Sequence, residues 1–281
     1  MGVESTPAPS PNPSRAGRNL PAAIAVGVGL GALILGSLYW QKVLFVVLVL
    51  AAVLVAVDEM IKALRTGGAV IPRIPLFVGT AAMLVSAYFG GPMALLVALA
   101  LTVLGTIFWR MPGGSIGFVR DASAGVFLLG YVPLLAGFAI LLAQPADGAG
   151  RVVTFFLVTV ASDVGGYASG TLFGKHPMAP TISPKKSWEG FAGSVLACIG
   201  AGIGSVVWLL DGDWWAGAIV GAVAVLTATV GDLAESMIKR DLGIKDMSNL
   251  LPGHGGVMDR LDSLLATAPA VWLVLHLLVK P

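Results

Sequence analysis

The stretch from residue 231 to residue 262, GDLAESMIKRDLGIKDMSNLLPGHGGVMDRLD, gathers side chains that could do phosphoryl chemistry. It is dense in Asp, Glu, Lys and Arg, although only 11% of the whole chain is charged. Apolar runs precede and follow it, so it lies at a membrane boundary. Charged side chains at such a place cost free energy, so they usually serve a function or fix the topology. The stretch is therefore the first candidate for a reaction site.

A helix over the first part of this stretch would present acid, hydroxyl and base on one face. The residues with that spacing are Asp232, Glu235, Ser236 and Lys239. Positions three and four apart are neighbours on a helix surface. After a Pro-Gly-His-Gly-Gly turn, Asp259 and Asp262 are three apart at the start of the last apolar segment. Two acid-bearing helix ends can therefore meet across the turn.

Two acidic helix ends that face each other could bind a divalent cation together with a polyphosphate. Carboxylates are hard oxygen ligands for Mg²⁺, and the backbone of Gly255 and Gly256, with the helix N-terminus that follows, can face phosphate oxygens. Basic side chains would neutralise the remaining charge: Lys239, Arg240, Lys245 and Arg260. A network of structural ion pairs at a membrane edge could use the same residues, and this alternative stays open.

Asp163 stands in the middle of another apolar segment, residues 152–174. An ionisable residue at that depth costs at least ~2.5 kcal/mol on insertion scales and is a site hypothesis by default. Glycines follow it at positions 165, 166, 170 and 174. They could allow close approach of another helix or access for a ligand, and both interpretations stay open.

The segment MAPTISPKKSWEG, residues 178–190, follows soon after the apolar segment and brings together hydroxyl and ammonium groups. These are Ser183, Lys185, Lys186 and Ser187. Lysines act as point charges toward phosphate, and hydroxyls add hydrogen-bond donors. A plain positively charged loop on the cytosolic side is the alternative. Elsewhere, Asp58 and Lys62 have the i, i+4 spacing of a helix-end ion pair.

Apolar helices must position these residues, because the chain is 57% hydrophobic with a mean hydropathy of +0.90. We expect an all-α, polytopic integral membrane protein. A bilayer core needs ~20 apolar residues per helix, which gives about nine transmembrane segments. Their predicted ranges are 20–40, 43–62, 74–90, 92–110, 122–143, 152–174, 190–210, 214–238 and 260–279.

Basic residues predict the orientation. With nine spans and a cytosolic N-terminus, only Lys42, Arg151 and Lys280 fall on the outer side, as the positive-inside rule requires. Residues 1–19 are rich in Pro and Ser and are predicted to be a disordered cytosolic tail. Residues 20–281 form one transmembrane domain, with the site in residues 152–281. A net charge of +2 argues against nucleic-acid binding.

The acid-rich stretch resembles the phosphatidate cytidylyltransferase, or CDP-diacylglycerol synthase, family of membrane enzymes. That family's signature runs SxxKR, then KD, then an apolar-PxHGG turn that closes in DRxD. The matching residues are Ser236, Lys239, Arg240, Lys245, Asp246, Leu251, Pro252, His254, Gly255, Gly256, Asp259, Arg260 and Asp262. The segment from Asp163 through SPKKSWEG also resembles the family.

The resemblance implies the reaction of CTP with phosphatidate to give CDP-diacylglycerol and pyrophosphate. It implies Mg²⁺, a bacterial plasma membrane and a site at its cytosolic face. A second cation and a homodimer are left open. We expect Asp232 and Asp259 to bind the metal, with Asp246 and Asp262 as partners.

The remaining roles concern the substrates. We expect Lys239, Arg240 and Arg260 to bind phosphate and His254 to shape the glycine turn. The other expected substrate-binding residues are Asp163, Ser183, Lys185, Lys186, Ser187, Ser236, Lys245, Gly255 and Gly256.

Three other functions remain to be weighed. The first is a cation- or proton-coupled transporter with Asp163 in its pathway, although transporters commonly carry matching interrupted helices in two halves. The second is a CTP-dependent polyprenol-type kinase. A CDP-alcohol phosphotransferase would need a DG, AR, G, D, D array on one helix, which this sequence does not contain.

Overall fold

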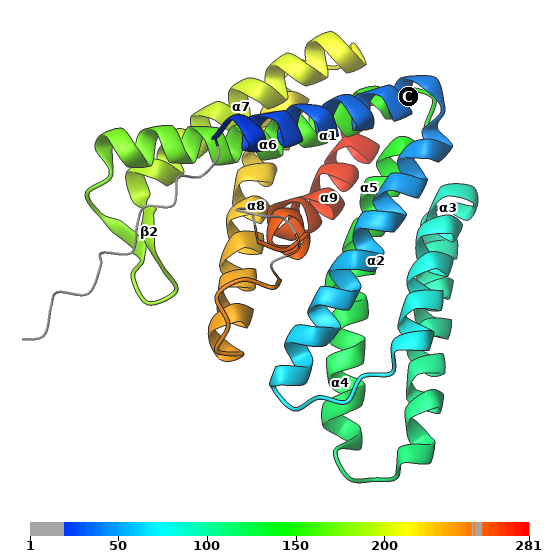
Figure 1. The fold of residues 1–281 in the computed structure, drawn as a ribbon. Coiled ribbons are helices and arrows are strands. Elements are labelled where there is room, and N and C mark those ends of the chain that lie inside the picture. Colours follow the sequence, from blue (N-terminus) through cyan, green and yellow to red (C-terminus); the bar gives the residue numbers. More distant parts are fainter. Residues whose placement is uncertain (1–19, 249, 251–254, 281) are drawn as a thin grey trace, which may run out of the picture.

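A computed structural model describes residues 20–248, 250 and 255–280 (Figure 1). The predicted disordered tail at residues 1–19 and the turn residue His254 lie outside these ranges. The described chain is nearly all helical, as predicted, and its only strands are two short ones in a hairpin.

The first half of the chain is helical. It comprises α1 (Leu20–Trp40), α2 (Lys42–Thr66), α3 (Arg73–Arg110), the short turn η1 (Met111–Gly113), α4 (Phe118–Leu129), the π turn η2 (Gly130–Leu134) and α5 (Leu135–Ala143). Pro133 lies inside η2 and has no N–H to donate, which accounts for the irregular turn between α4 and α5.

Helix α3 doubles back on itself at Gly91, which has a φ of 71° and precedes Pro92. A Cβ placed on Gly79 would lie 1.9 Å from Cγ2 of Thr102, although a straight helix would separate these residues by ~34 Å. The two arms of α3 therefore run antiparallel. They correspond to the predicted segments 74–90 and 92–110.

The second half carries the predicted site. Helix α6 (Gly148–Phe173) leads into strands β1 (Pro177–Ala179) and β2 (Ser183–Ser187), which pair antiparallel, and α7 (Trp188–Leu210), α8 (Trp214–Asp241) and α9 (Met258–Leu278) follow. Glycines allow these helices to pack closely. A Cβ on Gly165 would lie 2.7 Å from the carbonyl oxygen of Gly193, so helix packing is one role of the glycines after Asp163.

Seven helical segments in the described part of the chain are long and apolar enough to cross a membrane. This count takes both arms of α3 as one segment, and α1 contributes a shorter apolar helix over Gly31–Trp40. The structure is consistent with a multi-pass membrane protein. The count of nine spans and the cytosolic N-terminus stay predictions.

Charged residues gather at two opposite ends of the helices. Asp121 ties the loops at one end together, because it pairs with Arg110 at 2.9 Å and accepts the N–H of Val70 at 2.9 Å. Lys42 and Arg151 lie at the other end, where Lys42 donates to the carbonyl of Pro145 and Arg151 donates to the carbonyl of Leu275. The predicted ion pair between Asp58 and Lys62 is confirmed at 2.6 Å.

Candidate active site

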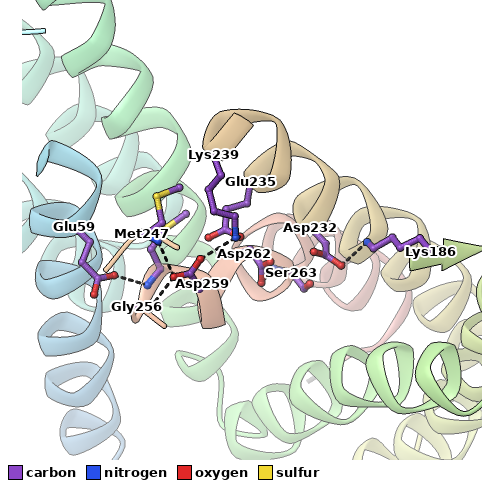
Figure 2. Close-up of polar contacts among 11 residues, drawn as sticks. Glu59, Lys186, Asp232, Glu235, Lys239, Met247, Gly256, Asp259, Asp262 and Ser263 are labelled. Carbon is purple, nitrogen blue, oxygen red and sulfur yellow. Dashed lines mark hydrogen bonds and ion pairs between the residues drawn. The ribbon is translucent and has the colours of Figure 1, made fainter. Parts of the chain in front are cut away.

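Helices α8 and α9 meet in antiparallel register, so their acidic residues face one another (Figure 2). The contact is close at Gly231, where a Cβ would lie 2.6 Å from the carbonyl oxygen of Asp262. One helix turn before Gly231, the hydroxyls of Thr227 and Thr267 are 3.4 Å apart. The two acid-bearing helix ends thus meet as the sequence suggested.

A cluster of Glu235, Lys239 and Asp259, hereafter the lysine cluster, joins the two helices. The Lys239 ammonium lies 2.5 Å from Oε2 of Glu235 and 2.8 Å from Oδ1 of Asp259. The second oxygen of Asp259 accepts the N–H groups of Met247, at 2.9 Å, and Gly256, at 2.7 Å. Asp259 therefore fixes the loop before α9 as well as the start of that helix.

Glu235 is the most buried acid of the lysine cluster, with 1% of the residue exposed. Its Oε2 contacts Lys239, but its Oε1 is buried without a hydrogen-bond partner among the described residues. A buried, unsatisfied carboxylate oxygen is costly because it loses its hydration without replacement. A cation or a hydrogen-bond donor is therefore expected beside Oε1.

Glu59 is a site residue that the sequence analysis did not single out. It comes from α2, is 3% exposed and accepts hydrogen bonds from the hydroxyl of Ser248 at 2.6 Å and the N–H groups of Val257, at 3.0 Å, and Met258, at 2.8 Å. The first N–H groups of a helix have no partner inside it, and a carboxylate there is also favoured by the helix dipole. Glu59 therefore anchors the start of α9 to α2.

The glycine turn fits closely around these two acids. A Cβ on Gly256 would lie 2.7 Å from Oε2 of Glu59, so only glycine allows this approach. Gly255 adopts a φ of 81°, in the left-handed region that favours glycine. Of the two glycines predicted to face phosphate, Gly256 directs its N–H to Asp259 in this structure.

A polar cavity of about 310 Å³ opens beside the lysine cluster, between α6, β2, α7 and α8. Four of the predicted site residues line it: Asp163, Lys186, Ser187 and Asp232. Lys186 forms an ion pair with Asp232, as Figure 2 also shows. Gly166, Gly170 and Gly190 also line the cavity, so ligand access past the glycines that follow Asp163 stays a prediction.

Three further predicted residues make contacts near the lysine cluster or the polar cavity. Arg240 reaches from α8 to the hairpin, where its Nε donates to the carbonyl of Ile182 at 2.5 Å, next to Ser183. Ser187 caps α7 by accepting the N–H of Gly190 at 3.1 Å. Oδ1 of Asp262 accepts the N–H of Ser263 at 2.7 Å.

The remaining predicted residues differ in how far the structure brings them to the site. Lys245 and Asp246 lie in the exposed segment after α8, and Ser236 is a half-buried residue of that helix. Lys185 belongs to β2, Arg260 to the first turn of α9, and His254 lies outside the described residues.

The predicted carboxylate ligands fit a magnesium ion only in part, because they already have other partners. Asp232 is paired with Lys186, and Asp259 already accepts hydrogen bonds from three donors. Within the described residues, no group of three or more His, Cys, Asp or Glu is arranged to hold a metal by itself. Mg²⁺ needs only one or two carboxylates when waters and substrate phosphates complete its shell, and the unsatisfied Oε1 of Glu235 could accept a cation or a hydrogen-bond donor.

The sequence of this chain matches a known family over nearly its whole length. The sequence model of the cytidylyltransferase family covers residues 21–278. The chain belongs to the cytidylyltransferase family. The match spans every helix from α2 to α9, so it includes the lysine cluster and the polar cavity.

Curated relatives within the family are phosphatidate cytidylyltransferases. The one from Mycobacterium leprae is 47% identical over 280 residues, which cover 94% of this chain and 90% of the relative. The one from Mycobacterium bovis is 46% identical over 283 residues, or 96% of this chain and 92% of the relative. The Pseudomonas aeruginosa enzyme is 39% identical over 202 residues, or 69% and 74%. These similarities confirm the resemblance drawn from residues 236–262 and set aside the transporter interpretation.

Proposed function

We propose that this protein transfers the cytidylyl group of CTP to phosphatidate, giving CDP-diacylglycerol and pyrophosphate for phospholipid biosynthesis. The observation that carries this proposal is the junction of α8 and α9, where Glu235, Lys239 and Asp259 form one buried cluster next to a polar cavity. Relatives that share 46–47% of their residues with this chain bear the corresponding enzyme name.

The reaction needs little proton chemistry, because the attacking phosphate of phosphatidate is already an anion. The barrier is electrostatic, since two negative groups must approach in line while pyrophosphate leaves. Lys186 and Ser187 line a cavity that could hold the triphosphate. The further proposed phosphate binders are Lys239, Arg240 and Arg260. Ser236 is a further donor.

We assign Asp232 and Asp259 as the magnesium ligands, with Asp246 and Asp262 as their partners. When bound, the ion would neutralise charge on the nucleotide phosphates. Because Asp259 accepts three hydrogen bonds in this structure, a ligand role requires Lys239 to exchange this carboxylate for a substrate phosphate. A second cation near the first remains part of the proposal.

We place the protein in the plasma membrane of a bacterium, with the site facing the cytosol. The collection of basic residues at the end that holds the lysine cluster supports this orientation. The partners are CTP, phosphatidate and the bilayer, without nucleic acid. A homodimer stays a prediction.

Purified protein in liposomes with phosphatidate and Mg²⁺ tests the proposal. With CTP, a lipid-linked cytidine product and pyrophosphate should form together. Replacing CTP by ATP or GTP should abolish most product, because the proposed function is specific for the cytosine nucleotide. Equal rates with ATP would instead indicate the kinase function.

A further inference from the structure

Tyr131 carries a polar group in the interior of the protein. Its hydroxyl oxygen is buried and has no hydrogen-bond partner among the described residues. A buried tyrosine hydroxyl usually finds a partner, because a polar group that loses water without replacement costs free energy. The residue lies in the middle of the apolar segment Phe118–Ala143, where lipid offers no replacement. A partner for this hydroxyl is therefore expected inside the protein.

The local structure holds the Tyr131 ring in one orientation. The residue lies in the π turn η2, where Pro133 interrupts the regular helix. Turns of this kind occur frequently at functional sites. Phe127, four positions earlier, stacks on the Tyr131 ring, with the ring centroids 5.5 Å apart and the ring planes inclined by 9°. The hydroxyl is thus held at a fixed place in the interior.

The Tyr131 hydroxyl lies within electrostatic range of the candidate active site. Among the charged groups that act on it, the carboxylate of Glu235 acts most strongly, followed by those of Asp262 and Asp232. Glu235 is also the residue whose Oε1 is buried without a partner among the described residues. The π turn between α4 and α5 therefore brings a hydroxyl toward the acid that lacks a donor.

The two unpartnered groups are complementary, since a phenol donates a hydrogen bond and a carboxylate accepts one. They are not hydrogen-bonded to each other, so a direct contact does not satisfy them. One water molecule between them would satisfy both, because a water-mediated hydrogen bond is nearly as favourable as a direct one. Oε2 of Glu235 already accepts from Lys239, so this water would complete the carboxylate.

We propose that a buried water molecule joins the hydroxyl of Tyr131 to Oε1 of Glu235, and that Tyr131 is a positioning residue of the reaction centre. This inference rests on the proposed function and adds to it a residue from the first half of the chain. In that function Lys239 exchanges Asp259 for a substrate phosphate. The water held by Tyr131 keeps Glu235 in place, so that Lys239 retains one fixed partner while it exchanges the other.

Removing the hydroxyl tests this role. Tyr131→Phe should lower kcat about tenfold, the effect of losing one hydrogen bond to a charged group, and leave the KM for CTP and for phosphatidate nearly unchanged. Tyr88→Phe is the matched control, because Tyr88 lies at the opposite end of the helices, where Gln144 donates to its carbonyl at 3.1 Å. A hydroxyl that served packing alone predicts wild-type turnover and equal or higher stability for Tyr131→Phe, and this result would overturn the proposal.

A double-mutant cycle with Glu235→Gln tests whether the two side chains act together. Tyr131→Phe should change little in a protein that already carries Glu235→Gln, because the water has then lost its charged acceptor. The cycle is measured by the melting temperature as well as by kcat, so it does not depend on the turnover of Glu235→Gln. Additive effects of the two changes on both quantities would contradict the proposal.

A crystal structure of the wild-type protein grown with Rb⁺ in place of K⁺ tests the identity of the bridging species. We expect density for a water molecule within hydrogen-bond distance of both oxygens and without an anomalous signal. An anomalous peak, a direct contact of the two side chains, or no density there when other buried waters are resolved would each overturn the proposal. Failure of the proposed function would appear separately, as absence of a lipid-linked cytidine product from the wild-type protein.

Discussion

Buried carboxylates determine the properties of the candidate site at the scale of single residues. Asp259 uses both oxygens to hold Lys239 and two backbone N–H groups, whereas Glu235 keeps one oxygen unsatisfied among the described residues. An ion-pair network that served stability alone would be expected to satisfy each buried oxygen. The unsatisfied oxygen therefore favours a centre that takes up a cation or a hydrogen-bond donor.

The assignment of Asp232 and Asp259 as ligands of one metal leads to a first prediction. Asp232→Asn and Asp259→Asn should each remove nearly all turnover, because each change removes a charge that balances the nucleotide phosphates. Since residues that act as a unit lose function non-additively, the double variant should be scarcely worse than either single one.

The measurement is the rate per folded protein across a Mg²⁺ titration, with Asp211→Asn at the exposed end of α7 as control. A structural network predicts a lower melting temperature with near-normal turnover instead. Full activity of either single variant at ordinary Mg²⁺ would refute the assignment of that residue.

Glu59 gives a second prediction, because it anchors the start of α9 from another helix. Glu59→Gln keeps the shape but weakens the acceptors of three hydrogen bonds, each worth about 1.5–3 kcal/mol when a charged group takes part. We expect a lower melting temperature and a lower kcat, with the KM for CTP nearly unchanged, since Asp259 would be positioned less well.

Asp58→Asn is the matched control for this variant. Asp58 is the neighbouring residue, and its ion pairs with Lys62 and Arg73 are partly exposed, so each should contribute at most about 1 kcal/mol. If Glu59→Gln and Asp58→Asn had the same melting temperature and kcat, Glu59 would have no positioning role.

Residue positions were predicted best from the sequence where the contacts are local. The spacing of Asp232, Glu235 and Lys239 placed them on one face of a helix, and Lys239 does pair with Glu235 four positions away. Glu59 was missed because its partners begin at Ser248, far along the chain. The local Asp58–Lys62 pattern gave no sign of these distant contacts.

At the scale of elements, the approach of α8 to α9 depends on Gly231. Gly231→Ala should separate the two helices, because the new Cβ would lie 2.6 Å from the carbonyl oxygen of Asp262 and 2.7 Å from Cβ of Ala266. Turnover should fall strongly while the protein remains folded. The measurement is kcat per folded protein together with the melting temperature.

Gly200→Ala in α7 controls for the higher helix propensity of alanine. A Cβ there would meet no atom within 4 Å, so this variant should gain up to about 1 kcal/mol of helix stability at no cost in activity. Unchanged turnover in Gly231→Ala would show that the close contact of α8 and α9 does not position the site.

Apolar segments predicted most helices, since a run of ~20 apolar residues has few alternatives in a bilayer. The reversal at Gly91 and Pro92 agrees with two separate predicted segments, 74–90 and 92–110, although they form one continuous assignment, α3. The hairpin of β1 and β2 was not foreseen. Its strands are three and five residues long, too short to give a clear alternating pattern.

At the scale of the whole molecule, the predicted cytosolic face carries more basic residues than the predicted outer face, and this asymmetry predicts the topology. A tag after Pro281 should be reachable from outside intact cells, whereas a tag before Leu20 should not, because basic residues are retained on the cytosolic side. Accessibility of each tag to a membrane-impermeant reagent is the measurement. Both tags on the same side would mean an even number of spans and would contradict the predicted nine.

The whole molecule contains two cavities of different character. A polar cavity is lined by α6, α7 and α8 together with the hairpin, and an almost wholly apolar one is lined by α1, α2, α5, α6 and α9. Figure 1 shows that α9 lies between α8, which lines the polar cavity, and α2, which lines the apolar one.

The most direct test of the account follows the two ends of CTP. Wild-type protein in phosphatidate liposomes with Mg²⁺ receives CTP labelled either at the α-phosphate or at the γ-phosphate. Cytidylyl transfer predicts that the α label appears in the lipid fraction and the γ label in pyrophosphate. Appearance of the γ label in the lipid, or no label in the lipid from either CTP, would contradict the proposed function.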